Sequence, residues 1–82
     1  MEFHPDFIRD LKKLDPPVRL DVEKRVDALK QNPFRSKSLK GFHNYFAERL
    51  GVYRILYYVR GDTLYFVRVL KRDIGYKHFT PR

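Results

Sequence analysis

The sequence predicts an α+β fold, with two N-terminal helices packed on one face of a small antiparallel β-sheet. Two patterns predict it. Apolar residues recur at helical spacing over residues 5–32, and segments 52–59 and 63–70 are rich in Val, Ile, Leu, Tyr and Phe. The chain has 82 residues, which suffices for one domain with a modest core. We therefore expect a single domain that spans residues 1–82.

The first 32 residues are expected to form a helical hairpin. Asp15 is a favourable N-cap and Pro16 suits the first helical position, so the second helix should begin there. Asn32-Pro33 should end it, because a residue that precedes proline disfavours the helical conformation. The apolar stripes expected to face the sheet are Phe7, Leu11 and Leu14 on the first helix, and Val18, Val22, Val26 and Leu29 on the second.

Residues 52–59 and 63–70 are expected to form a β-hairpin, preceded by a strand over residues 45–50. Residues 2–4 are compatible with a short further strand. We take residues 60–62 as a three-residue turn, and side chains alternate between the two faces along each strand. The side chains that should then face the helices are Tyr53, Ile55, Tyr57, Tyr65, Val67 and Val69.

This pairing places Arg54 directly opposite Arg68 on the face away from the helices, and Arg72 continues on that face. Like charges that oppose each other across two strands destabilise the strand pair. A bidentate anion between the two guanidinium groups would remove the repulsion. We therefore predict an anion site among these arginines. The alternative is that Glu48 or Asp73 pairs with one of them while the other reaches water.

The net charge of +8 lies entirely in the second part of the chain. Residues 1–32 carry seven Lys/Arg and seven Asp/Glu, whereas residues 33–82 carry eleven Lys/Arg and three Asp/Glu. A basic excess that is segregated in this way indicates a surface for a polyanion, above all nucleic acid.

Composition disfavours several classes of protein. Because there is no cysteine, no disulfide or thiolate metal site can form. The three histidines and ten acids show no ligand spacing, so we expect no metal and no cofactor. No run of about 18 apolar residues indicates a membrane span, and the N-terminus lacks the apolar block of a signal peptide. We expect a cytoplasmic protein without a membrane partner.

Four short motifs follow the helical hairpin in order. They are Leu39-Lys40-Gly41 in a basic loop, RLGVYRILY at residues 49–57, VLKR at residues 69–72, and Tyr76. Their order and spacing resemble the RelE/ParE superfamily of bacterial and archaeal toxins over nearly the whole chain. The resemblance implies the RelE-like α+β fold. It also implies an antitoxin partner whose acidic segment wraps the helices and the sheet, and through which alone operator DNA would be bound.

RelE-like members of the superfamily cleave messenger RNA in the ribosomal A site, whereas ParE-like members poison DNA gyrase. A RelE-like activity implies a metal-independent endoribonuclease that acts on the ribosome, inhibits translation and arrests growth. The RNA 2′-hydroxyl would be the nucleophile, and guanidinium groups would stabilise the extra charge of the transition state. Two alternatives stay open: a gyrase inhibitor, and a catalytically weak homologue that acts mainly as a repressor partner of its antitoxin.

The resemblance also implies roles for individual residues. Arg54 and Arg72 match two sheet arginines of the family and are expected to clamp the transition state, and Arg49 matches a position that is often basic. Tyr76 and His78 are rival candidates for acid–base catalysis, since a histidine titrates near neutrality and a tyrosine needs nearby cations to lower its pKa. The residues expected to contact RNA are Lys37, Lys40, Arg68, Lys71 and Lys77.

One departure from the family leaves the general base open. The best-studied RelE pattern carries a lysine pair in the strand before Arg54, where this sequence reads YFAER with only Arg49 basic. A rival from outside the family is a small RNA-binding module that stacks bases on Tyr58, Leu64 and Phe66.

Overall fold

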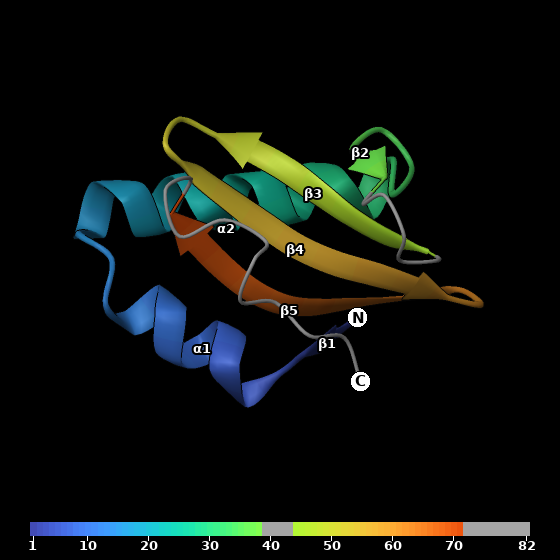
Figure 1. Ribbon diagram of the computed structural model, residues 1–82, viewed down its shortest axis with the longest axis horizontal. Helices are drawn as coiled ribbons and strands as arrows, with labels where there is room; N and C mark the ends of the chain where they lie inside the picture. Colours follow the sequence, from blue (N-terminus) through green and yellow to red (C-terminus); the bar gives the residue numbers. More distant parts are fainter. Residues whose placement is uncertain (39–43, 72–82) are drawn as a thin grey trace.

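A five-stranded mixed sheet with two helices on one face makes up the described part of the chain, residues 1–38 and 44–71 of the computed structural model (Figure 1). The elements are β1 (Glu2–Phe3), α1 (Pro5–Lys12), α2 (Pro16–Gln31), β2 (Lys37–Ser38), β3 (Tyr45–Leu50), β4 (Tyr53–Arg60) and β5 (Thr63–Lys71). The strand order is β1-β5-β4-β3-β2, with β1 parallel to β5 and the other neighbours antiparallel. The predicted α+β fold is confirmed, except that the parallel pairing of β1 makes the sheet mixed where an antiparallel sheet was predicted.

Both helices begin where the sequence predicts, for different local reasons. His4 caps α1, because its Nδ1 accepts a hydrogen bond from the backbone N–H of Asp6 at 3.0 Å. α2 begins at Pro16, and the backbone carbonyl of Asp15 accepts from the N–H of Arg19 at 2.9 Å. The side chain of Asp15 makes no capping hydrogen bond. Among the described residues, neither helix has the length and apolar character needed to cross a membrane.

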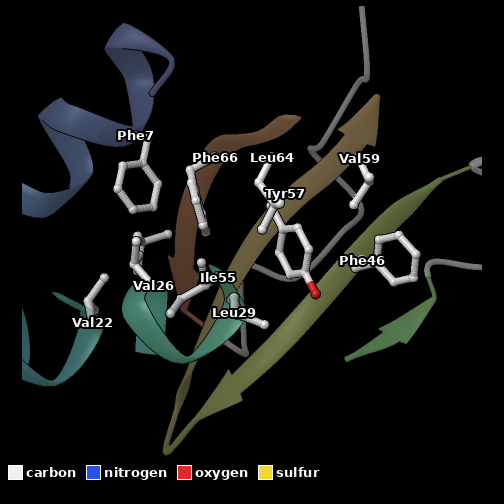
Figure 2. Close-up of a cluster of buried hydrophobic side chains, with 11 residues drawn as sticks. Phe7, Val22, Val26, Leu29, Phe46, Ile55, Tyr57, Val59, Leu64 and Phe66 are labelled. Carbon is white, nitrogen blue, oxygen red and sulfur yellow. The ribbon is translucent and has the colours of Figure 1, made fainter. Parts of the chain in front are cut away.

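The main core lies between the helices and the sheet (Figure 2). α1 packs on β5 and α2 packs on β3. Val22, Val26 and Leu29 are buried on α2, as the apolar stripe predicts. Tyr57 of β4 is fully buried, and its hydroxyl donates to the carbonyl oxygen of Pro33 at 2.6 Å. This hydrogen bond ties the chain that leaves α2 to the centre of the sheet.

The turn between β4 and β5 is one residue shorter than the sequence analysis assumes. Gly61 and Asp62 form a two-residue turn, so that Arg60 pairs with Thr63. Gly61 has a φ of +59°, which glycine adopts without steric cost, and two-residue turns match the twist of a hairpin. The three-residue turn predicted for residues 60–62 is therefore wrong.

A β-bulge in β5 shifts the pairing a second time. Tyr57 pairs with Phe66, whereas the preceding residue Leu56 pairs with Arg68. Between these two pairs β5 has one residue more than β4. This extra residue is Val67, which has no partner on β4. The predicted opposition of Arg54 and Arg68 is therefore wrong.

The short turn and the bulge decide which side chains of β5 face the helices. Leu64 and Phe66 lie in the main core, whereas Tyr65 and Val67 were predicted there. Tyr65 and Val67 lie on the opposite face, so those two predictions are wrong. Beyond the bulge the two one-residue shifts add to two, which restores the predicted faces but not the predicted partners. Val69 therefore faces the helices as predicted.

Candidate functional site

The face of the sheet that turns away from the helices carries the candidate site, and we call it the outer face. Its side chains are Tyr45, Ala47 and Arg49 of β3, Arg54, Leu56 and Tyr58 of β4, and Tyr65, Val67, Arg68 and Leu70 of β5. A buried apolar centre built on Ala47 and Leu56 separates a tyrosine-rich end from an arginine-rich end. The outer face is thus divided into two chemically different parts.

Arg49 and Arg54 form the arginine-rich end, where they pair directly across β3 and β4. Directly opposed residues of an antiparallel pair have Cα atoms about 5 Å apart, so the two guanidinium groups start from adjacent positions. Arg54 is half-buried, and its Nη1 donates to the carbonyl oxygens of Tyr53 at 3.1 Å and Gly51 at 3.4 Å. Within residues 1–38 and 44–71, neither arginine makes an ion pair with a carboxylate.

A like-charge pair does involve Arg54, but it is a pair that the sequence did not predict. Arg54 faces Leu70 on β5 and Arg49 on β3, where Arg68 was expected. Like charges at opposed positions destabilise a strand pair. An anion that relieves this repulsion would therefore lie at the β3–β4 pair and not at the β4–β5 pair.

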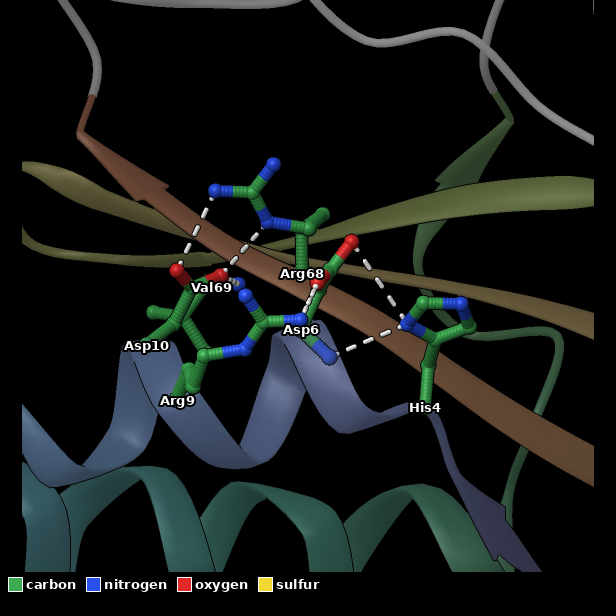
Figure 3. Close-up of polar contacts among 6 residues, drawn as sticks. All are labelled: His4, Asp6, Arg9, Asp10, Arg68 and Val69. Carbon is green, nitrogen blue, oxygen red and sulfur yellow. Dashed lines mark hydrogen bonds and ion pairs between the residues drawn. The ribbon is translucent and has the colours of Figure 1, made fainter.

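Arg68 is bound to the protein by a carboxylate that the sequence analysis missed (Figure 3). Its Nε donates to Oδ2 of Asp10 at 2.7 Å and its Nη2 to Oδ1 at 3.1 Å. The same Oδ2 accepts the backbone N–H of Val69 at 2.9 Å. The hydrogen bond to Asp10 raises the pKa of Arg68 above its ordinary value. Arg68 is therefore neutralised by an acid of α1, where the sequence suggested Glu48 or Asp73 as a possible partner.

The contact of Asp10 with the sheet could have been predicted from its position on α1. It lies three residues after Phe7, which is buried, so its side chain projects beside the buried stripe of the helix. A carboxylate at the margin of a packed helix face is placed to meet the sheet below it.

Glu48 is the centre of a second cluster that the sequence analysis did not anticipate. It lies on the helix side of β3 with 6% of its surface exposed. Its carboxylate accepts from Nη1 of Arg25 at 2.9 Å, from Oγ of Ser36 at 2.6 Å, and from Nη2 of Arg35. Burial alone would raise the pKa of Glu48, but the hydrogen bonds from Arg35, Ser36 and Arg25 hold it below its ordinary value.

The Glu48 cluster also supports the outer face. Arg25 donates from Nη1 to the backbone carbonyl of Arg49 at 3.2 Å, which fixes the backbone of the residue that opposes Arg54. The proposed pairing of Glu48 with Arg54 or Arg68 is wrong, because Glu48 points to the other face. The signal in the sequence was an acid at a position of β3 whose alternation with its neighbours predicts a side chain on the helix side.

The remaining predicted site residues are only partly described. Lys71 is exposed at the end of β5, and Lys37 begins β2, where its backbone pairs with Ala47. The others lie outside the described residues, together with Asp73: Lys40, Arg72, Tyr76, Lys77 and His78.

The stacking module suggested by the sequence has two of its three residues on the wrong face. Leu64 is 8% exposed and Phe66 is fully buried, both in the main core. Tyr58 does lie on the outer face, where its ring stacks on that of Tyr65. Among the described residues, the aromatic side chains on the outer face are therefore tyrosines.

Chemically, the arginine-rich end suits an anion that can bridge two guanidinium groups. Guanidinium groups are always charged and present planar sets of donors to phosphate oxygens. The backbone carbonyls that accept from Arg54 limit the reorganisation of its guanidinium group when an anion binds, and the hydrogen bond from Arg25 holds the backbone of Arg49. This arrangement can stabilise negative charge that develops on a phosphate group.

Comparison with known proteins gives matches over most of the chain. Residues 1–76 match the family described as ParE toxin of type II toxin-antitoxin system, parDE. Toxin RelE3 of Methanocaldococcus jannaschii is 35% identical over 83 residues, an alignment that covers 94% of this chain and 94% of that protein.

Solved structures show the same fold. The RelB-RelE antitoxin-toxin complex from Methanococcus jannaschii contains a chain with a TM-score of 0.81 and 33% identity, covering 98% of this chain and 100% of that chain. The toxin-antitoxin complex RelBE2 from Mycobacterium tuberculosis gives a TM-score of 0.77 and 32% identity, covering 87% of each chain. Both structures are complexes of a toxin with its antitoxin.

Proposed function

Because the chain belongs to the RelE/ParE superfamily of type II toxin–antitoxin toxins, we propose that it is a ribosome-dependent endoribonuclease that cleaves messenger RNA in the A site. The observation that carries the proposal is the direct pairing of Arg49 with Arg54 on the outer face. A phosphodiester between these guanidinium groups would relieve their repulsion. Its transition state, which carries more charge, would be stabilised further than its ground state.

In the proposed reaction the RNA supplies its own nucleophile. The 2′-hydroxyl attacks the adjacent phosphorus, a general base accepts its proton, and the bond from phosphorus to the 5′-oxygen breaks as that oxygen receives a proton. The products are a 2′,3′-cyclic phosphate and a 5′-hydroxyl. Arg54 and Arg49 stabilise the equatorial oxygens, and Arg72 is the proposed third cation. Tyr76 and His78 are the proposed rivals for proton transfer.

Membership of the toxin superfamily also suggests binding partners for this chain. The solved relatives are antitoxin–toxin complexes, which support a cognate antitoxin as the partner of this chain. We propose the ribosome and messenger RNA as further partners, operator DNA as a ligand reached only through the antitoxin, and the cytoplasm as the site of action.

The second candidate function is inhibition of DNA gyrase. The match of residues 1–76 to the ParE toxin family favours it. A third candidate is a catalytically weak homologue that acts with its antitoxin as a repressor. It is favoured by β3, in which Arg49 is the only basic residue.

One experiment separates these functions. The protein is induced in a bacterial host, message 5′ ends are mapped, and plasmid supercoiling is measured in the same cultures. We expect growth arrest with new 5′ ends inside translated messages and unchanged supercoiling. Arrest with uncut messages and altered supercoiling would establish the gyrase alternative. Absence of both effects would favour the repressor.

Variants connect the result to the outer face. Arg54→Ala and Arg72→Ala are expected to abolish or strongly weaken the arrest and the message cleavage. Arg60→Ala is the matched control, because Arg60 is exposed at the far end of β4. It should arrest growth as the parent chain does.

A further inference from the structure

A row of side chains crosses the outer face at its tyrosine-rich end, and we call it the tyrosine row. Tyr45 of β3 pairs with Tyr58 of β4, Tyr58 pairs with Tyr65 of β5, and Tyr65 pairs with Glu2 of β1. Residues at directly paired positions share a face of the sheet. Three phenol rings and one carboxylate therefore lie in register across four strands.

The rings of the row form a stack that runs across the strands. The centroids of Tyr58 and Tyr65 lie 4.7 Å apart with an interplanar angle of 9°, and those of Tyr45 and Tyr58 lie 5.0 Å apart at 39°. Because the stack follows the strand-to-strand direction, the ring face of Tyr65 that does not meet Tyr58 turns toward β1. A further planar group inserted there would continue the stack.

A hollow of about 400 Å³ borders the tyrosine row, with Tyr65 among its lining residues. The other polar residues that line it are His4 before α1, Asp6 in the first turn of α1, and Arg68 of β5. Its volume is within the range of sites that bind small molecules or parts of larger ones. The hollow is thus a site of suitable size next to a stack that can be extended.

The polar groups of the hollow suit the edge of a base better than a phosphate. Among the described residues that line the hollow, Glu2 presents a carboxylate without an ion pair, and Asp6 presents one that is paired with Arg9. The guanidinium group of Arg68 is already held by Asp10. The carboxylates accept hydrogen bonds and repel anions. The Nδ1 of His4 accepts from the N–H of Asp6, which assigns its proton to Nε2 and leaves that nitrogen as a donor (Figure 3). Carboxylates pair with exocyclic amino groups, which adenine, cytosine and guanine carry and uracil lacks.

We propose that the tyrosine row and its hollow bind one unpaired RNA base that carries an exocyclic amino group, stacked on Tyr65. The proposal rests on the proposed function, since it supplies the substrate of that function with a base-reading position. Tyr58 lies four residues from Arg54 on β4, about 13 Å at the usual rise of a strand. The arginine-rich end therefore holds the phosphate and the tyrosine row holds a base of the same strand.

The test uses the full chain and labelled five-nucleotide 2′-O-methyl RNA, which cannot be cleaved through its 2′-oxygen. Affinity is measured by fluorescence anisotropy at one fixed salt concentration, because phosphate binding depends on salt. Tyr65→Leu is expected to weaken binding of the adenine oligomer about tenfold, equivalent to about 1.4 kcal/mol. Tyr65→Phe retains the ring and should retain the affinity. Phe34→Leu removes an exposed aromatic side chain that packs on the helix side and should change nothing.

Two measurements on the parent chain need no variant to fold. Adenine, cytosine and guanine oligomers should bind more tightly than the uracil oligomer. An abasic oligomer should bind about tenfold more weakly than the adenine oligomer. Equal binding of the abasic and adenine oligomers would overturn the proposal, because only phosphates would then be recognised.

The outcomes separate this proposal from the proposed function. If Arg54→Ala weakens RNA binding and Tyr65→Leu does not, the outer face binds phosphate, the proposed function stands and the stacking site is overturned. If Tyr65→Leu weakens binding of the antitoxin while RNA binding is unchanged, the row belongs to the protein partner and the proposal is wrong. If Tyr65 controls RNA binding while induced protein cuts no message, the stacking site stands and the nuclease fails.

Discussion

The arginines on the two sides of β3 meet opposite surroundings. On the helix side, Arg25 and Arg35 converge on Glu48, which is buried between them. On the outer face, Arg49 and Arg54 oppose each other, and no carboxylate among the described residues pairs with either. The first group is arranged as the stability of the fold requires. The second is arranged against it, and an anionic ligand is the group that would complete it.

The largest effect is expected from Arg54. Replacing it with alanine should lower the rate of message cleavage on programmed ribosomes about 10²- to 10³-fold, the range seen when one preorganised donor to a transition-state oxyanion is removed. Arg60→Ala should cleave within about twofold of the parent chain. A parent-like rate for Arg54→Ala would contradict the proposal that the arginines of the outer face act in message cleavage. Arg54→Lys should recover only part of the rate, because an ammonium group cannot bind a phosphate in bidentate fashion.

The Glu48 cluster should show the opposite behaviour, with a large effect on stability. Glu48→Gln removes the charge between Arg25 and Arg35, and breaking a buried pair costs about 3–5 kcal/mol when both partners are buried. The arginine side chains are 42% and 35% exposed, so we expect a smaller loss, about 2 kcal/mol, in urea unfolding. Asp27→Asn, in the exposed pair with Lys30, is the control and should change stability by less than about 0.5 kcal/mol.

The same carboxylate predicts a pH dependence. Hydrogen bonds hold the pKa of Glu48 below its ordinary value, so its contribution is complete above the unfolded pKa, about 4.3, and is lost as the pH falls toward the folded value. The free energy of unfolding of the parent chain should therefore fall between pH 5 and the acid limit of folding (about pH 2–3) more steeply than that of Glu48→Gln. If the free energies of unfolding of the two proteins fall in parallel as the pH is lowered, the Glu48 cluster adds no pH-dependent stability.

The smallest effect is expected from Arg49, and it tests whether the repulsion between Arg49 and Arg54 lowers the free energy of unfolding. Arg49→Thr replaces one of the opposed charges with a residue of high β-propensity, and should raise the free energy of unfolding by a few tenths of a kcal/mol. Arg49→Lys keeps the charge and should leave stability unchanged. A loss of stability in Arg49→Thr would mean that Arg49 stabilises the fold. The arginines on both sides of β3 would then stabilise it, contrary to our expectation.

The sequence predicts the elements well, because helix caps, prolines and apolar spacing act locally. α2 begins at Pro16 after Asp15, and the hairpin turns at Gly61, as those residues dictate. The face of each β5 residue between the turn and the bulge depends on whether the turn has two or three residues, and the sequence supports either length. Patterning alone therefore identifies Arg54 as an outer-face residue without identifying the residue opposite it.

The features of the structure that the sequence did not predict depend on contacts between segments that are distant in the chain. Asp10 binds Arg68 and Val69 from 58 and 59 residues away, next to the bulge at Val67. Glu48 collects its partners from α2 and from the chain before β2. Neither carboxylate has a local sequence signal that specifies its partner, since the packing of α1 and α2 on the sheet brings them together.

The contact between Asp10 and Val69 also has a consequence for solubility. β1 covers β5 only at Tyr65 and Phe66, so the edge of β5 continues past it. Exposed strand edges invite pairing with another chain, and natural proteins block them with charges and short edge strands. The carboxylate of Asp10 accepts the N–H of Val69, so this donor is not available to an incoming strand. One side chain thus blocks the edge of β5 against strand pairing at Val69.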